Sequence, residues 1–279
     1  MMRHLLFFML VLLIPAPALA GLTLSPANVN NGEVAVLRWQ GEPLSFGVAR
    51  FLDDVIYLYP DSGGAIALLP IGLSVEEGDY PLHAALVDRR GRTTTVKLQL
   101  HVSHKERPLE QLTLPQNMVT PDAESLARIQ RESEQLKALF TARSERFWTH
   151  FQRPVDEEVS SVFGKRRLLN GQPKSPHSGT DFRSPAGTPV GSLSHGRVVL
   201  VADLFYTGQT VVVDHGEGLF SVYAHLSEVL VDEGRELRVG DVLGEVGSTG
   251  RSTGAHLHLT VRLLEERIDP LALLAAFGE

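Results

Sequence analysis

The 279-residue chain contains no cysteine, and this absence excludes several kinds of chemistry. Without thiols it can form no disulfide bond, no thiolate metal site and no cysteine nucleophile, so histidine and carboxylate side chains are left as metal ligands. A chain of this length can still bury enough apolar surface to fold without disulfides. Basic residues are also scarce, 26 against 33 acidic ones, and the net charge of −7 argues against a general nucleic-acid-binding protein.

Long hydrophobic runs are absent beyond the first twenty residues. Within those residues, Leu5 to Ile14 form a ten-residue apolar run after a short polar start. The run is too short to span a bilayer comfortably, and Ala18-Leu19-Ala20 has the small-x-small pattern of a cleavage site. We therefore predict that residues 1–20 are a secretory signal peptide and that the mature protein is exported, with no stable membrane insertion. An uncleaved anchor is the alternative.

Residues 21–103 have the pattern of short β-strands separated by turns. Apolar and polar residues alternate with period two over residues 96–102, as in a half-buried strand, and Asp88-Arg89-Arg90-Gly91 has the composition of a hairpin turn. This segment is predicted to be a small β-sandwich, immunoglobulin-like in type. Its histidines have no metal-ligand spacing, and we expect them to be structural or surface residues.

Residues 104–150 are predicted to connect two domains. The segment up to about residue 120 is polar with scattered prolines, and Thr120-Pro121 then has the residue types of a helix N-cap and first helical position. The apolar residues of the following helix share one face: Leu126, Ile129, Leu136 and Phe140. We expect an amphipathic spacer that packs on a neighbouring domain; a coiled-coil interaction arm is the alternative.

Residues 151–279 contain β-rich runs separated by glycine-containing turns, which predicts a second, antiparallel β-domain. The glycine-rich run from Gly247 to Gly254 precedes a strand and not a helix, so we interpret it as a loop shaping a groove and not as a phosphate-binding loop. His215 lies between Asp214 and Gly216 and is predicted to be a turn residue. The chain as a whole is thus expected to be mainly β.

Six of the eleven histidines lie between residues 177 and 258. His177 and Asp181 are spaced H-x-x-x-D, and His256 and His258 are spaced H-x-H, which places both on one face of a strand. Imidazole and carboxylate groups are the usual ligands of a catalytic zinc. If these residues and His225 converge, the chain is a hydrolase that uses a metal-activated water as nucleophile. Each motif alone favours a structural role, and only their combination favours a metal site.

Together, three runs resemble the lysostaphin-like (LytM-type) zinc metallopeptidases: His177-Ser178-Gly179-Thr180-Asp181, Tyr223-Ala224-His225-Leu226, and Gly247 through His258. The resemblance covers about residues 155–272. It implies a small antiparallel β-fold, the duplicated hybrid motif, with an open groove over one Zn²⁺ per chain. It further implies zinc ligands at His177, Asp181 and His258, and catalytic roles for His225 and His256, which the sequence does not divide between the two.

The resemblance also implies a substrate and a location. Its members cleave peptide bonds in bacterial peptidoglycan, and the upstream β-domain and helix look like those of Gram-negative exported members, so we expect a periplasmic endopeptidase. Within a local basic cluster, Arg166 is the best candidate for contacting substrate carboxylates. Two alternatives remain: a non-catalytic LytM-type activator of cell-wall amidases, and a cell-wall binding module that keeps zinc for stability. The predicted organisation is a signal peptide (1–20), a β-sandwich (21–103), a linker with a helix (104–150) and a peptidase domain (151–279).

Overall fold

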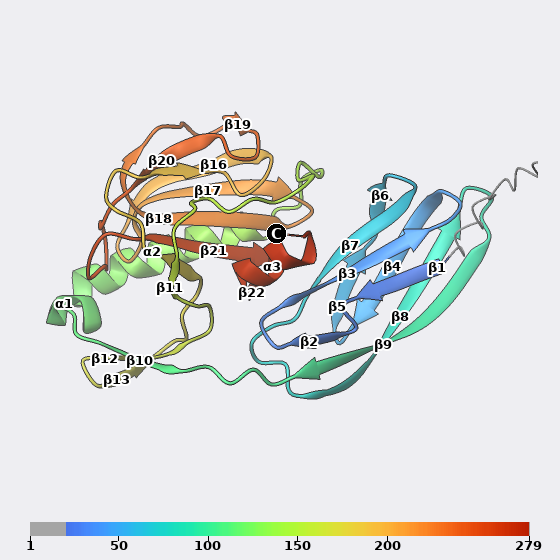
Figure 1. Ribbon diagram of the computed structural model, residues 1–279, viewed down its shortest axis with the longest axis horizontal. Helices are drawn as coiled ribbons and strands as arrows, with labels where there is room; N and C mark the ends of the chain where they lie inside the picture. The colour runs from blue at the N-terminus through green and yellow to red at the C-terminus, as the bar shows by residue number, and fades with distance from the viewer. Residues whose placement is uncertain (1–20, 279) are drawn as a thin grey trace, which may run out of the picture.

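The computed structural model describes residues 21–278, so the predicted signal peptide lies outside the described residues. Strands dominate, and Figure 1 shows two β-rich lobes joined by an extended segment that runs along one side of the molecule. The mainly β fold expected from the sequence is confirmed. Within residues 21–278, no helix combines the length and apolar character that crossing a membrane requires.

The N-terminal lobe consists of two sheets that face each other. One sheet has the strand order β1 (Gly21–Ser25), β3 (Val34–Gln40), β7 (Gly64–Pro70) and β6 (Tyr59–Asp61). The other has the order β2 (Asn28–Asn30), β9 (Thr93–Ser103), β8 (Gly78–Asp88), β4 (Leu44–Phe51) and β5 (Asp54–Tyr57). Side chains such as Leu37, Leu82 and Leu100 fill the space between the sheets. The immunoglobulin-like type stays a prediction.

Strands β3 and β7 are apolar on both faces because both faces are covered. Ala35 and Leu37 point into the core of the N-terminal lobe, whereas Val34 and Val36 belong to the core of the C-terminal lobe. On that second side they join residues of the C-terminal helix α3 (Pro270–Ala276), which Figure 1 places between the lobes. Burial on two faces produces a nearly continuous apolar sequence in place of alternation. The two lobes therefore meet through packed apolar side chains.

The C-terminal lobe is built on one large antiparallel sheet, as the sequence predicted. Its main path is β11 (Val159–Ser161), β14 (Thr180–Phe182), β21 (Leu257–Leu263), β18 (Leu219–Val229), β17 (Gly208–Gly216), β16 (Gly196–Leu204) and β19 (Glu236–Leu237). Strand β20 (Val242–Val246) pairs with β15 (Pro189–Gly191) and β18, and β22 (Glu266–Ile268) pairs with β21. The leucines and valine of β21 are buried, so the alternate positions of this strand face away from the core.

The linker between the lobes contributes a strand that the sequence did not reveal. Strand β10 (Leu109–Leu112) pairs in parallel with β12 (Arg166–Leu169), which forms a hairpin with β13 (Gln172–Lys174). A short helix, α1 (Gln116–Val119), follows, and Leu114 and Val119 pack against Leu169 of the hairpin. Residues 109–119 are therefore attached to the C-terminal lobe.

Helix α2 (Ala123–Phe140) begins three residues after the predicted N-cap. The Asp122 carboxylate caps the helix by accepting a hydrogen bond from the backbone N–H of Ser125 at 2.8 Å. The prediction of Thr120 as N-cap was therefore wrong. An aspartate at this position can accept the free N–H groups of the first turn, and the proline lies before the helix instead of at its first position.

The predicted apolar face of α2 packs on the peptidase lobe only at its C-terminal end. Phe140 is buried and meets Phe220 of β18 edge to face, with ring centroids 5.4 Å apart. Leu126, near the other end, keeps 53% of its surface exposed. The helix is thus a spacer packed on its neighbour over its last turns.

Candidate metal centre

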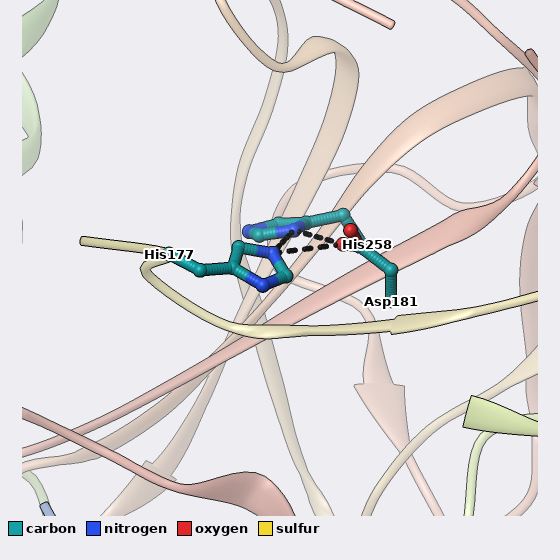
Figure 2. Close-up of side chains that lie close together, drawn as sticks. All are labelled: His177, Asp181 and His258. Atoms are coloured by element: carbon teal, nitrogen blue, oxygen red, sulfur yellow. Dashed lines mark hydrogen bonds and ion pairs between the residues drawn. The ribbon is translucent and has the colours of Figure 1, made fainter. Parts of the chain in front are cut away.

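Three side chains of the C-terminal lobe converge on one point (Figure 2). Asp181 on β14 lies directly opposite His258 on β21, and His177 enters from the segment before β14. His177 Nε2 lies 3.0 Å from Asp181 Oδ1 and 3.1 Å from His258 Nδ1, and Asp181 Oδ1 lies 2.6 Å from His258 Nδ1. All three residues are buried. They form a group that could hold a metal ion.

The second nitrogen of each imidazole shows why these three atoms fit a cation. His177 Nδ1 lies 3.0 Å from the carbonyl oxygen of Val162, which can only accept, so this nitrogen is assigned the proton. His258 Nε2 lies 3.0 Å from the hydroxyl of Thr260, which can accept a hydrogen bond from a proton on this nitrogen. With the second nitrogens protonated in this way, His177 Nε2, His258 Nδ1 and Asp181 Oδ1 can turn lone pairs toward a common point. A cation at that point could be bound by all three atoms.

The spacing of the three atoms also suits zinc. Zinc ligands in a tetrahedral site lie about 2.0–2.1 Å from the metal, which separates them from one another by about 3.3 Å. The observed separations of 2.6–3.1 Å need only a slight expansion to reach that geometry. Burial alone would raise the pKa of the Asp181 carboxyl, but hydrogen bonds and positive charge from His177 and His258, when these imidazoles carry the facing protons, outweigh burial and hold the pKa well below its usual range. The carboxylate is therefore ionised, as a ligand must be.

Two more histidines lie beside this group. The His225 ring is centred 5.8 Å from that of His258 and 4.7 Å from that of His256. His256 Nε2 lies 3.8 Å from Asp181 Oδ1. His225 donates its Nδ1–H to the carbonyl of Thr249 at 2.8 Å, and His256 Nδ1 lies 2.9 Å from the carbonyl of Gly254. In the neutral form of each ring, Nε2 is thus the nitrogen that can accept a proton.

The family model described as peptidase family M23 matches residues 175–270, the stretch that contains all five of these residues. A crystal structure from Pseudomonas aeruginosa assigned to peptidase M23 is 33% identical in sequence and aligns with a TM-score of 0.68. That alignment covers 88% of this chain and 95% of the other. The chain belongs to peptidase family M23.

Two curated relatives match less than half of this chain. The peptidoglycan DD-endopeptidase ShyA of Vibrio cholerae is 45% identical over 112 residues, which are 39% of this chain and 26% of that protein. The DD-carboxypeptidase/endopeptidase Mpg of Neisseria meningitidis is 37% identical over 119 residues, which are 43% of this chain and 27% of that protein. The alignments thus span about a quarter of the length of these relatives. The LytM-type resemblance drawn from the motifs is confirmed.

The M23 site holds His225 in an unusual backbone conformation. His225 has a φ of +63°, in the left-handed region that few residues other than glycine adopt. Burial, together with the charges of the neighbouring His258 and His256, lowers the pKa of His225 to about 3. Its imidazole is therefore neutral near pH 7. Strained backbone of this kind is often found at functional sites, where the surrounding structure maintains it.

A glycine-rich loop of the M23 domain holds His225 in position. Thr249, in the loop predicted to shape the groove, accepts a hydrogen bond from the backbone N–H of Gln209 at 2.9 Å and donates one to the carbonyl of Leu226 at 2.8 Å. Gly208 has a φ of +60°, and a methyl group there would collide with the backbone of Thr249 and Gly250. The close approach of two glycines thus brings the carbonyl of Thr249 to His225.

The structure brings together all five residues singled out from the M23 motifs, but Arg166 is not among their neighbours. Arg166 is exposed on β12, and its role in substrate binding stays a prediction. The adjacent Arg167 contacts the group instead, with Nη2 3.6 Å from Asp181 Oδ2. Successive residues of a strand point to opposite sides, so only one of two neighbouring arginines can face the metal group.

His215 is not a turn residue, as the sequence had suggested, and lies in β17 of the M23 domain. It is fully buried, and it donates from Nδ1 to the carbonyl of His195 at 2.7 Å. The hydroxyl of Ser221 lies 2.7 Å from its Nε2. Gly216 and Gly218, which follow His215, suggested a turn, but the strand continues to Gly216 before the chain reverses.

Proposed function

We propose that this protein is an exported zinc metalloendopeptidase that hydrolyses peptide bonds in peptidoglycan cross-links. The observation that supports this most directly is the convergence of three lone-pair atoms, from His177, Asp181 and His258, beside two further histidines with free Nε2 atoms. The names of ShyA and Mpg, both endopeptidases, support the substrate class. We further propose that the protein acts in the periplasm, in line with its predicted signal peptide.

Three residues of the site would hold the metal ion, and the two neighbouring histidines would handle the proton and the substrate. One zinc ion, when bound by the three ligands, would supply an acidified water and polarise the scissile carbonyl. His225 and His256 each present an unprotonated Nε2 beside that position, so either can accept the proton that the attacking water loses. The histidine that does not take the proton would orient the substrate carbonyl or the water. Burial of His225 keeps its imidazole neutral and ready to accept.

The test is to incubate purified protein and zinc with isolated peptidoglycan sacculi and to separate the released fragments by chromatography and mass spectrometry. We expect loss of cross-linked dimers, and the masses of the products identify the bond that is cleaved. A chelated sample and the His177→Ala variant should both leave the sacculi intact. Unchanged sacculi with the zinc-loaded wild type would contradict the proposal and favour a non-catalytic amidase activator.

A further inference from the structure

The linker strand β10 brings a carboxylate into contact with two residues that neighbour the metal-ligand group, Ser161 and Arg167. Glu110 lies opposite Arg167 in the parallel pairing of β10 with β12, and its side chain is only 16% exposed. It accepts hydrogen bonds from Ser161 Oγ at 2.8 Å and from Arg167 Nε at 2.9 Å. Each of these two partners in turn contacts a different member of the ligand group.

The first contact runs from Glu110 through Ser161 to His177. A carboxylate can only accept, so the Ser161 hydroxyl must point its single proton at Glu110. The hydroxyl oxygen then offers its lone pairs to His177 Nδ1, which lies 3.2 Å away. Together with the carbonyl of Val162 at 3.0 Å, this oxygen favours the proton on His177 Nδ1, and His177 Nε2 keeps its lone pair for the metal. Hydrogen bonds to the second nitrogen of a ligating histidine generally fix its tautomer and ring orientation.

The second contact runs from Glu110 through Arg167 to Asp181. The hydrogen bond from Arg167 Nε to Glu110 fixes the guanidinium so that Nη2 lies 3.6 Å from Asp181 Oδ2. The other carboxylate oxygen, Oδ1, is the one that faces His177 and His258. Arg167 is thus positioned on the outer oxygen, and Oδ1 is left for the metal.

Glu110 can act in this way because two neighbouring basic side chains compensate its negative charge. Lys165 Nζ lies 3.4 Å from Glu110 Oε1, and Arg167 supplies a second positive charge at the other oxygen. Burial raises the pKa of Glu110, but Ser161 and the two basic residues outweigh burial and lower it overall. The group is therefore an ionised acceptor that holds both of its neighbours in one orientation.

We propose that Glu110 is a positioning residue of the metal centre, through which the interdomain linker orients two of the three metal ligands. The inference rests on the proposed metal site and goes beyond it, since it makes the linker part of the centre. It also means that residues 151–279, the peptidase domain delimited from the sequence, lack one of the groups that organise the ligands.

The test compares zinc affinity in the metal-free full-length wild type and in the Glu110→Gln variant, by competition with a chromophoric chelator. Glutamine keeps the shape, but its amide cannot accept from Ser161 and Arg167 at both ends. Loss of an outer partner of a metal ligand typically weakens metal affinity by about 10- to 100-fold, and we expect a loss in this range. Glu106→Gln, a change of an exposed glutamate in the same linker, is the matched control and should leave the affinity unchanged.

A spectroscopic measurement separates positioning from a general loss of structure. With cobalt in place of zinc, the visible absorption bands should shift in Glu110→Gln but not in Glu106→Gln, because the ligand field depends on how His177 and Asp181 are held. Ser161→Ala interrupts only the contact to His177, so it should weaken zinc binding less than Glu110→Gln. The unfolding temperature of each metal-free variant reports any loss of structure independently.

The outcomes distinguish this inference from the function on which it rests. If the wild type binds no zinc, both the proposed function and the role of Glu110 are overturned. If wild type and Glu110→Gln bind zinc equally well and give identical cobalt spectra, the role of Glu110 alone is overturned. A lower unfolding temperature in Glu110→Gln with unchanged zinc affinity would likewise show a structural residue and refute the inference.

Discussion

His215 gives the peptidase domain a buried group whose protonation should lower the free energy of unfolding in acid. The side chain is fully buried in β17. Desolvation is the main cause that lowers its pKa, and the carbonyl of His195 and the charge of Asp214 only partly oppose it; the resulting pKa is about 4. With its proton on Nδ1, the neutral ring satisfies both of its hydrogen bonds, to the carbonyl of His195 and from Ser221.

The sign and size of the effect follow from linkage. In the unfolded chain a histidine has a pKa of about 6.5, so between pH 6.5 and 4 the unfolded state binds a proton that the folded state does not. The free energy of unfolding therefore falls as the pH falls through this window. Between pH 7.5 and pH 5, a folded pKa of about 4 predicts a loss of about 2 kcal/mol from this group alone.

The assay is urea unfolding of the metal-free wild type and the His215→Gln variant at pH 7.5 and pH 5. The variant loses some stability at both pH values, but its free energy of unfolding should fall less toward pH 5 than that of the wild type, by about 2 kcal/mol. His83→Gln, a change of an exposed histidine on β8, should keep the wild-type pH dependence. Equal pH dependence in wild type and His215→Gln would refute the assignment of His215 as a neutral buried group.

Four further expectations follow from the site and the packing. His225→Ala should lower kcat by about 10²- to 10⁴-fold, as expected for loss of a proton acceptor, and should leave zinc content measured by atomic absorption unchanged; parallel loss of zinc would make His225 a ligand. Gly208→Ala should lower kcat with a smaller effect on zinc affinity, because the displaced Thr249 no longer fixes His225; an unaltered kcat would contradict this role of the loop. Phe140→Ala should reduce the free energy of unfolding by about 3–5 kcal/mol in urea titrations, and a change below 1 kcal/mol would show that α2 is not packed as described. Glu217, whose pKa burial raises to about 7, is best tolerated protonated, so Glu217→Gln should stabilise the protein more at pH 8 than at pH 5 in thermal unfolding; the reverse order would be inconsistent with the buried carboxyl.

The sequence alone determined the residues of the candidate metal centre. His256 and His258 are two apart, and Asp181 follows His177 at a short distance, so local backbone geometry fixes much of how each pair is presented. The same holds for the antiparallel β-structure of the C-terminal lobe, because its strands and glycine turns follow one another along the chain. Local periodicity was sufficient for the strands, and the five residues of the site were assigned from the resemblance that the three motifs carry together.

The tertiary structure alone decided which other groups surround that centre. Glu110 contacts Ser161 and Arg167, which lie more than fifty residues away in the sequence. The contact depends on the parallel pairing of β10 with β12, which the local sequence of neither strand predicts. The choice of Arg167 over Arg166 depends on which side of β12 faces the ligands, and the burial of His215 depends on strands that cover β17 from both sides. These features are set by long-range pairing and by exclusion of water, and a linear pattern of residues contains neither.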